Sequence, residues 1–139
     1  MVDRVNTVVL ADTAQRYIAT FNNVSDGTGE TDATKVAIDT LVTGLGVAPR
    51  TLVVEKIEWA MQGYTRIELY WDTPEQNLIA VLTTDMGEMD FVEDDKMQGL
   101  IDPDADADST RVGGNIVLTS AGANSGDSYT ITMWLRKKQ

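Results

Sequence analysis

Two residue types are missing from this chain of 139 residues, which contains no histidine and no cysteine. These two side chains supply many of the nucleophiles, general bases and transition-metal ligands that work near neutral pH, so their absence argues against an enzyme. Without cysteine, disulfides contribute nothing to the stability of the fold. We therefore expect a structural or binding protein without a cofactor.

Long apolar runs and positive charge are also scarce. No segment approaches the roughly 18 to 20 apolar residues that span a bilayer, so we expect no membrane partner. The first residues, MVDRVNTVVLADT, lack the basic and continuous apolar regions of a secretory signal, which predicts a cytoplasmic product. The 22 acidic residues outnumber the 11 basic ones, and the net charge of -11 predicts that the surface repels nucleic acid.

Alternation of apolar and polar residues, which is typical of half-buried strands, runs along much of the chain. It is clearest in residues 64–72 and in the C-terminal segment 127–138, at whose end Lys137 and Lys138 are expected to be solvated. The chain offers further expected strands near residues 5–10, 15–22, 34–40, 51–61, 78–83, 88–92 and 114–120.

Residues 51–61 and 64–72 look like the two arms of a β-hairpin. The first segment is rich in β-branched residues, and Gln62-Gly63 stands between the two at a tight-turn spacing. Trp59 and Trp71 fall on the apolar faces of these segments, so both are expected in the core.

Two segments also fit short helices. Thr73-Pro74-Glu75-Gln76 has the form of a capping box with proline at the first helical position, and apolar residues between 38 and 45 are spaced like one helical face. We favour strands at both places, because roughly eight short strands separated by glycine, asparagine and aspartate turns describe a sandwich consistently. The sequence thus predicts an all-β fold, a single-domain antiparallel β-sandwich of jelly-roll type over residues 1–139.

An acidic stretch interrupts this pattern. Residues 85–109 hold ten carboxylates opposed only by Lys96, and we expect an acidic, solvated loop at about 93–109. Alternating aspartates within it resemble the start of a calcium loop, but Ser109 and Asn115 stand where an EF-hand needs glycine and glutamate. We therefore expect no metal site, and the weak candidates for a divalent cation are Asp102, Asp104, Asp106 and Asp108.

Trp134 is the residue most suggestive of binding. Its strand parity places it outside the core, on the same face as Thr130, Thr132 and Arg136. An outward tryptophan serves either as part of a subunit contact, which we favour, or as a platform on which a sugar stacks. Trp134 and Arg136 are therefore the predicted interface residues.

Several longer motifs resemble a group of small virion-associated proteins of tailed bacteriophages. They are SDGTGE at 25–30 with KVAIDTL at 35–41, IEWAMQGYTRIELYWD at 57–72, GEMDF at 87–91 and NIVLTSAGANSGDSYTITMWLRK at 115–137. The resemblance covers most of the chain except the acidic loop, and it implies a structural protein without catalytic residues.

Phage proteins of this size and composition are often jelly-roll decoration, or cement, proteins on the head exterior. The resemblance therefore implies a protein that is made in the host cytoplasm, binds the major capsid protein and stabilises the shell, with a homo-oligomer expected. An acidic body would not compete for the genome and would stay dispersed before assembly. The alternative is a carbohydrate-binding adhesin module on the virion head or neck.

Overall fold

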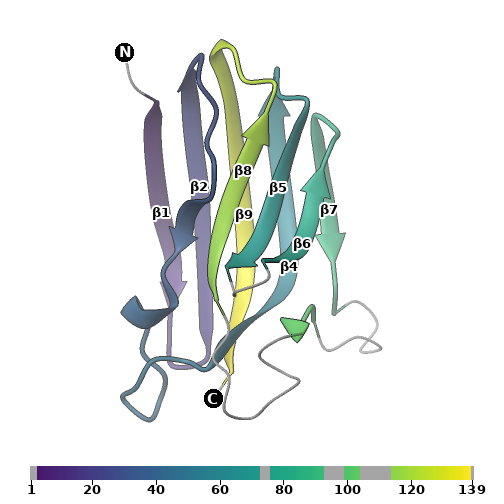
Figure 1. The fold of residues 1–139 in the computed structure, drawn as a ribbon. Coiled ribbons are helices and arrows are strands. Elements are labelled where there is room, and N and C mark those ends of the chain that lie inside the picture. Colours follow the sequence, from purple (N-terminus) through teal and green to yellow (C-terminus); the bar gives the residue numbers. More distant parts are fainter. Residues whose placement is uncertain (1–2, 73–75, 93–98, 104–113, 139) are drawn as a thin grey trace.

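Alternating and continuous apolar segments form strands along nearly the whole chain. The computed structural model describes residues 3–72, 76–92, 99–103 and 114–138, and the strands lie in two antiparallel sheets (Figure 1). The strands are β1 (Arg4–Asp12), β2 (Arg16–Asp26), β3 (Ala33–Val36), β4 (Thr51–Gln62), β5 (Arg66–Asp72), β6 (Asn77–Leu82), β7 (Met86–Asp90), β8 (Asn115–Ala121) and β9 (Ser125–Lys138). The described residues thus contain nine strands where about eight were expected.

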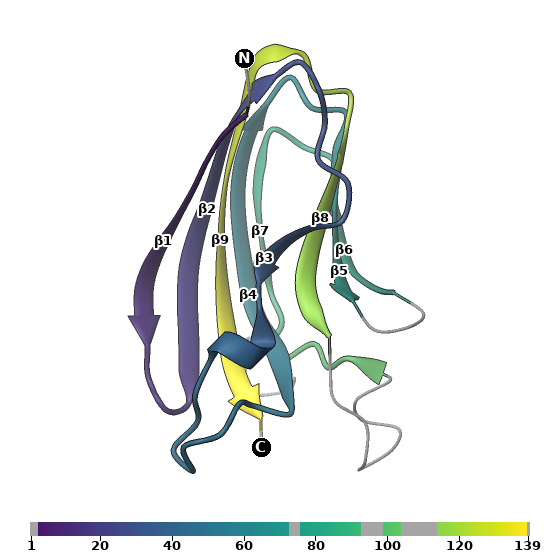
Figure 2. The ribbon, with the colours of Figure 1, turned by 60° about the vertical axis from the view of Figure 1, so that its left-hand side comes forward.

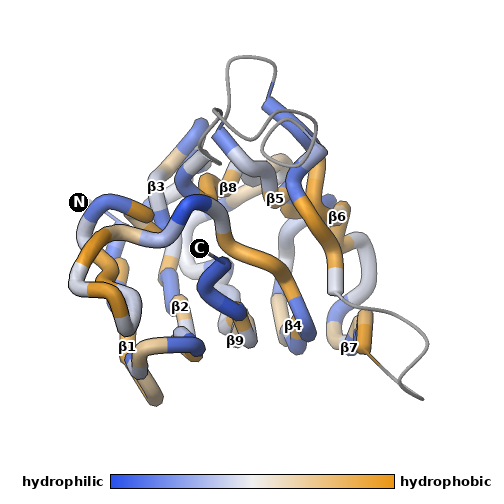
Figure 3. Tube along the Cα trace, turned by 90° about the horizontal axis from the view of Figure 1, so that it is seen from below, coloured by the Kyte–Doolittle hydropathy of each residue, from blue (hydrophilic) through white to orange (hydrophobic). Residues whose placement is uncertain are grey.

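The two sheets pack face to face as a β-sandwich. The larger sheet has the order β1-β2-β9-β4-β7, and the smaller sheet has the order β3-β8-β5-β6, so the two form separate rows when viewed from below (Figure 3). From β2 to β9 the chain crosses to the other sheet at every step except β5 to β6. This alternation over eight strands confirms the jelly-roll type, and β1 extends the larger sheet by one strand.

The predicted hairpin of residues 51–61 and 64–72 is wrong. Its two segments form β4 and β5, which lie in different sheets, because the chain crosses from one layer to the other between them. Gly63 has a φ of 90°, and a Cβ there would lie 2.1 Å from the Asp127 carboxylate. The glycine marks a tight crossover, which has the same local sequence signals as a hairpin turn.

The segment expected as a strand at 34–40 changes conformation halfway. β3 ends at Val36, and a short 3₁₀ helix, η1 (Ile38–Thr40), follows it. The buried Ile38 side chain and the hydrogen bond from its N–H to Asn115 Oδ1 (2.8 Å) fix this turn against β8. At the other contested place the strand prediction is confirmed, since residues 77–82 form β6.

The core lies between the sheets and is built from one face of each strand. Trp59 and Trp71 are both buried, as expected, and each indole N–H has an acceptor. Trp71 Nε1 donates to the Leu52 carbonyl (3.1 Å), and Trp59 Nε1 donates to the Thr84 carbonyl (3.0 Å). The fully buried large side chains also include Phe21, Ile57, Ile67, Leu69, Ile116, Tyr129, Ile131 and Met133.

The expectation that Lys137 is solvated is wrong, because this residue is buried. It shares the inward parity of Leu135 on β9, so its side chain points between the sheets. Its Nζ donates to Asp12 Oδ1 (2.5 Å) and to the carbonyls of Thr13 (2.5 Å) and Val42 (2.9 Å). Three acceptors compensate the buried ammonium, which ties the β1–β2 turn and the segment after η1 to the end of β9.

Candidate functional site

The side of the larger sheet that faces away from the core forms the candidate site, which we call the outer face. Trp134 lies half-buried on it, at the position predicted from its parity in β9. β9 lies between β2 and β4, so this tryptophan is near the middle of the sheet. The outer face also carries, from β2, β9, β4 and β7, Ile18, Thr20, Asn22, Thr130, Thr132, Arg136, Lys56, Glu58, Ala60, Met86, Glu88 and Asp90.

Trp134 has an apolar neighbour on one side and a cation on the other. Its register partners are Ile18 on β2 and Lys56 on β4. The Lys56 ammonium lies 5.0 Å from the centroid of the indole ring, within cation–π distance. The hydrogen bond to Glu58 raises the pKa of Lys56 above its ordinary value, so the group that faces the ring remains a cation.

Arg136 lies on the same face and forms an ion pair with Glu55. Its NH1 group lies 3.3 Å from Glu55 Oε2, and Arg16 binds the other oxygen of the same carboxylate. Glu55 is buried and sits at a register shift of β4 between Val54 and Lys56. The structure thus brings Trp134 and Arg136 together, with Arg136 oriented by a carboxylate beneath it.

A shallow depression lies beside Trp134 on the outer face, and sequence reasoning did not find it. Its volume is about 440 Å³, and its lining consists of Glu58, Trp59, Ala60, Met86, Gly87, Glu88, Thr130 and Thr132. A Cβ on Gly87 would lie 2.5 Å from Cζ2 of Trp59, so only glycine lets the indole reach this position under β7. A glycine inside a strand is the one sequence signal that points to such a close approach.

Hydroxyl and carboxylate groups surround this depression. Thr20 and Thr132 share a hydrogen bond between their hydroxyls (2.8 Å), and the Thr130 hydroxyl donates to Asn22 Oδ1 (2.8 Å). The region therefore offers hydrogen-bond acceptors next to an aromatic surface. Such a combination can bind a polyhydroxylated ligand or pack against another protein.

One residue of the expected acidic, solvated loop, Asp102, is not solvated. This residue is fully buried, and its carboxylate accepts hydrogen bonds from Asn77 Nδ2 (2.9 Å) and from the Gly114 N–H (3.4 Å). These two hydrogen bonds connect the Asp102 segment to β6 and to the residue that precedes β8. The remaining weak metal candidates, Asp104, Asp106 and Asp108, lie outside the described residues. Within residues 3–72, 76–92, 99–103 and 114–138, no three acidic side chains gather into a metal site.

A second polar cluster lies inside the sandwich, around Glu30. Its Oε2 accepts from Lys35 Nζ (2.6 Å), and its Oε1 accepts from Asn23 Nδ2 (2.7 Å) and the Tyr129 hydroxyl (2.5 Å). Burial, and then the hydrogen bond to Glu30, raise the pKa of Tyr129. Burial raises the pKa of the neighbouring Tyr64 to about 12, and its ring packs edge-on against the ring of Tyr129, with the two centroids 5.7 Å apart. The cluster is a buried structural network.

Comparisons with known proteins identify no relative, since the chain matches no protein-family model, no curated protein and no solved structure. In the part of the chain that the structure describes, no helix has the length and apolarity needed to cross a membrane. One fold supports many functions, so only the chemistry of the outer face, and not the fold, points to a function for this chain.

Proposed function

We propose that this protein is a non-enzymatic structural protein of a bacteriophage virion, a capsid decoration protein that binds the head exterior through the outer face. The observation that carries the proposal is Trp134, a large aromatic side chain left half-exposed near the middle of a sheet. Tryptophan and arginine are enriched at the centres of protein interfaces, and Arg136 lies on the same face. The partner in this proposal is the major capsid protein, met on the capsid exterior after synthesis in the host cytoplasm.

The charge distribution supports a protein contact at this face. Three cations of the outer face, Arg16, Arg136 and Lys56, are each paired with glutamates. The face is therefore locally balanced, although the whole chain carries a net charge of -11. A partner can approach it without meeting the repulsion of the acidic surface elsewhere.

A decoration protein stabilises a shell because its contacts exist only in the assembled state. Binding should therefore saturate on preassembled capsids and be weak on unassembled capsid protein. The experiment compares wild type with Trp134→Ala, which we expect to lower capsid occupancy and leave the melting temperature unchanged. Measurement is by quantitative cosedimentation with capsids that lack this protein.

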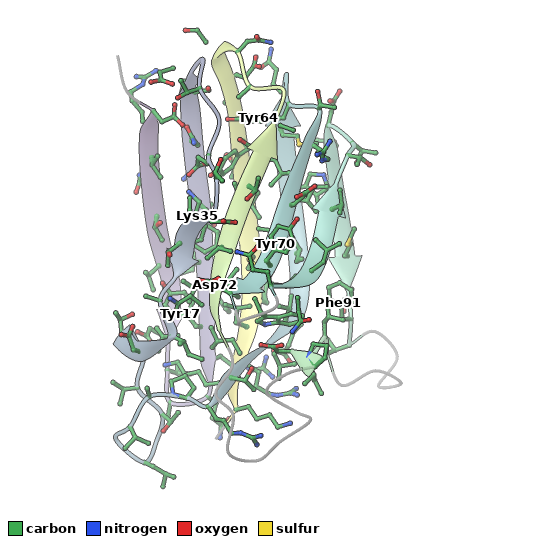
Figure 4. The ribbon with its side chains drawn as sticks, in the orientation of Figure 1. Tyr17, Lys35, Tyr64, Tyr70, Asp72 and Phe91 are labelled. Carbon is green, nitrogen blue, oxygen red and sulfur yellow. The ribbon has the colours of Figure 1, made fainter. Side chains whose placement is uncertain are left out.

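A matched control comes from the other sheet. Tyr70 is a half-buried aromatic residue on β5, and its hydroxyl bonds to Glu68 (Figure 4). Tyr70→Phe should bind capsids as wild type does. Undiminished occupancy with Trp134→Ala, or an equal loss with Tyr70→Phe, would contradict the proposal.

The depression beside Trp134 favours a second candidate, a carbohydrate-binding adhesin module on the virion head or neck. Glu58, Glu88 and Thr130 can accept hydrogen bonds from sugar hydroxyls, while the exposed Met86 offers apolar surface to a sugar ring. Glu88→Gln should then weaken glycan binding on an array and leave particle incorporation normal. Glycan binding that is lost with Trp134→Ala, with normal capsid occupancy, would replace the decoration proposal with this one.

A further inference from the structure

The buried network around Glu30 brings together a primary amine, a carboxylate and a carboxamide. Lys35 Nζ lies 2.6 Å from Glu30 Oε2, and Asn23 Nδ2 donates to Glu30 Oε1 (2.7 Å). The two nitrogens therefore bind the two oxygens of one carboxylate. A lysine amine is a nucleophile once it has lost its proton, and a carboxylate within hydrogen-bond distance can take that proton. The network thus holds the groups needed to join two side chains by an amide bond.

All three groups are shielded from water. Asn23 is 1% exposed, and the side chains of Lys35 and Glu30 are 3% and 11% exposed. The ring of Tyr129 lies beside the amine, with its centroid 5.6 Å from Lys35 Nζ, and the Tyr129 hydroxyl donates to Glu30 Oε1 (2.5 Å). A site closed to water favours attack by a neighbouring amine over hydrolysis of the carboxamide.

The fold fixes the amine and the carboxamide on facing sheets. Asn23 belongs to β2 of the larger sheet, and Lys35 belongs to β3 of the smaller sheet. In Figure 2 the chain leaves β2 at the upper end of the sandwich and descends to β3, and Glu30 lies in this connection. Two reactive groups held together in a folded core react at a high effective concentration, which compensates for the weak reactivity of a carboxamide.

Stability alone does not explain one atom of the network. Asn23 Oδ1 is buried and has no hydrogen-bond partner among the described residues, although Asn23 Nδ2 has two acceptors, Glu30 Oε1 and Asp3 Oδ2 (3.1 Å). The ion pair of Lys35 with Glu30 needs no carboxamide beside it. A buried polar atom without a partner calls for an explanation, and a chemical role for its group is one. The position of Asn23 therefore points to a reaction at its carboxamide carbon.

We propose that Lys35 and Asn23 form an intramolecular amide (isopeptide) bond, with Glu30 as the residue that moves the protons. Lys35 first gives one proton to Glu30 through their hydrogen bond, which leaves a neutral amine and a neutral acid. Both neutral groups cost less to bury than the two ions. The lone pair of Lys35 Nζ then attacks Cγ of Asn23, and the carbonyl electron pair moves onto Oδ1.

The second half of the reaction expels the amide nitrogen of Asn23. Glu30 passes its proton to Nδ2, with which it already shares a hydrogen bond, and takes a second proton from Lys35 Nζ. The electron pair on Oδ1 forms the carbonyl again, and the bond from Cγ to Nδ2 breaks with its electrons on nitrogen. Ammonia leaves and takes the proton from Glu30, so ammonium is released and the carboxylate is restored. The step needs no oxidant and no cofactor.

The bond has a consequence for the fold. It joins β2 to β3 across the two sheets and closes a loop between residues 23 and 35. A closed loop lowers the entropy of the unfolded chain, which raises the stability of the folded state. The bond forms once in each chain, so the protein turns over no substrate, and the inference does not depend on the proposed function.

Mass spectrometry of the full chain tests the bond. Formation removes one ammonia, so the wild type should be about 17 Da lighter than its sequence. Lys35→Arg and Glu30→Gln should each have the full mass of their sequences, because the first lacks the primary amine and the second cannot accept the proton. Asn22→Ala is the matched control and should keep the loss, since Asn22 is adjacent to Asn23 but bonds to Thr130 on the outer face.

Tryptic digestion of the wild type locates the bond and does not depend on the folding of any variant. Trypsin does not cut after an acylated lysine, so residues 17–50 should remain one peptide that lacks one ammonia, with no fragment ions from breaks between residues 23 and 35. A succinimide at an asparagine also removes one ammonia, but it leaves Lys35 open to cleavage. Complete cleavage after Lys35, a loss of ammonia that persists in Lys35→Arg, or a loss of water that joins Lys35 to Glu30 would each overturn the proposal.

Discussion

Lys56 on β4 lies against two carboxylates and one indole ring. Its ammonium lies 3.2 Å from Glu58 Oε1, 3.5 Å from Glu88 Oε1 and 5.0 Å from the centroid of Trp134. Glu58 and Glu88 are register partners on β4 and β7, so their like charges stand directly opposite. The Lys56 ammonium therefore offsets the repulsion between the two glutamates, and it places a positive charge beside the predicted interface tryptophan.

Replacing Lys56 with a neutral residue should leave the repulsion between Glu58 and Glu88 uncompensated. We expect Lys56→Gln to lower the melting temperature, with a larger loss at low ionic strength than at high, because salt screens the two glutamates. Adding Glu88→Gln to that variant should recover most of the loss. Thermal unfolding at two salt concentrations measures both effects, and a loss that does not depend on salt would contradict the explanation.

The two faces of β9 should differ in what substitution costs. Ile131 is fully buried and Thr130 is exposed, although they are adjacent. Ile131→Ala should lower the free energy of unfolding by about 2 to 5 kcal/mol. Thr130→Ala should lower it by less than about 1 kcal/mol. Urea denaturation gives both values, and equal losses would mean that β9 is buried on both sides.

The buried pair of Glu30 and Lys35 should be costly to break and cheaper to replace. Glu30→Ala leaves the Lys35 ammonium buried without its carboxylate, and we expect a loss of about 3 to 5 kcal/mol. The double variant Glu30→Leu, Lys35→Met should be clearly more stable than Glu30→Ala alone, because no charge is then left unpaired. A double-mutant cycle of Glu30→Leu, Lys35→Met and the double variant in denaturant measures the coupling between the two side chains.

Asp26 should stabilise the fold near neutral pH and lose this contribution in acid. Hydrogen bonds from the Thr28 hydroxyl and N–H lower the pKa of Asp26 from 3.8 to about 2. The folded state thus favours the carboxylate, so this contribution is present above pH 3.8 and is lost as pH falls through about 2. Carbon NMR titration of Asp26 should give the lowered pKa, and Thr28→Val should raise it toward the ordinary value.

The stability profile provides a separate check on Asp26. Asp26→Asn should flatten the fall in the free energy of unfolding between about pH 4 and pH 2, because asparagine does not titrate there. Denaturant midpoints at a series of pH values measure this slope. An unchanged slope would mean that the hydrogen bonds of Thr28 do not favour the charged form.

The alternation of apolar and polar residues predicted much of the candidate site. The alternation in β9 placed Met133 inside and Trp134 outside, and both positions are found in the structure. The same parity also places Lys137 inside, but its charge suggested solvent, because the acceptors Asp12 and Val42 come from distant segments. Alternation predicts toward which face of the sheet a side chain points. It does not predict which hydrogen-bonding groups that side chain meets there.

Local sequence patterns were enough to predict most strands, the inward and outward sides of most of them, and the sandwich class, because side-chain alternation is a property of consecutive residues. Sheet membership came from long-range pairing, which separated β4 from β5 and brought Glu58, Glu88 and Thr132 around one depression. The three strands that carry these residues are far apart along the chain. Pairing between such strands depends on the packing of the whole core, and no short window of sequence contains that information.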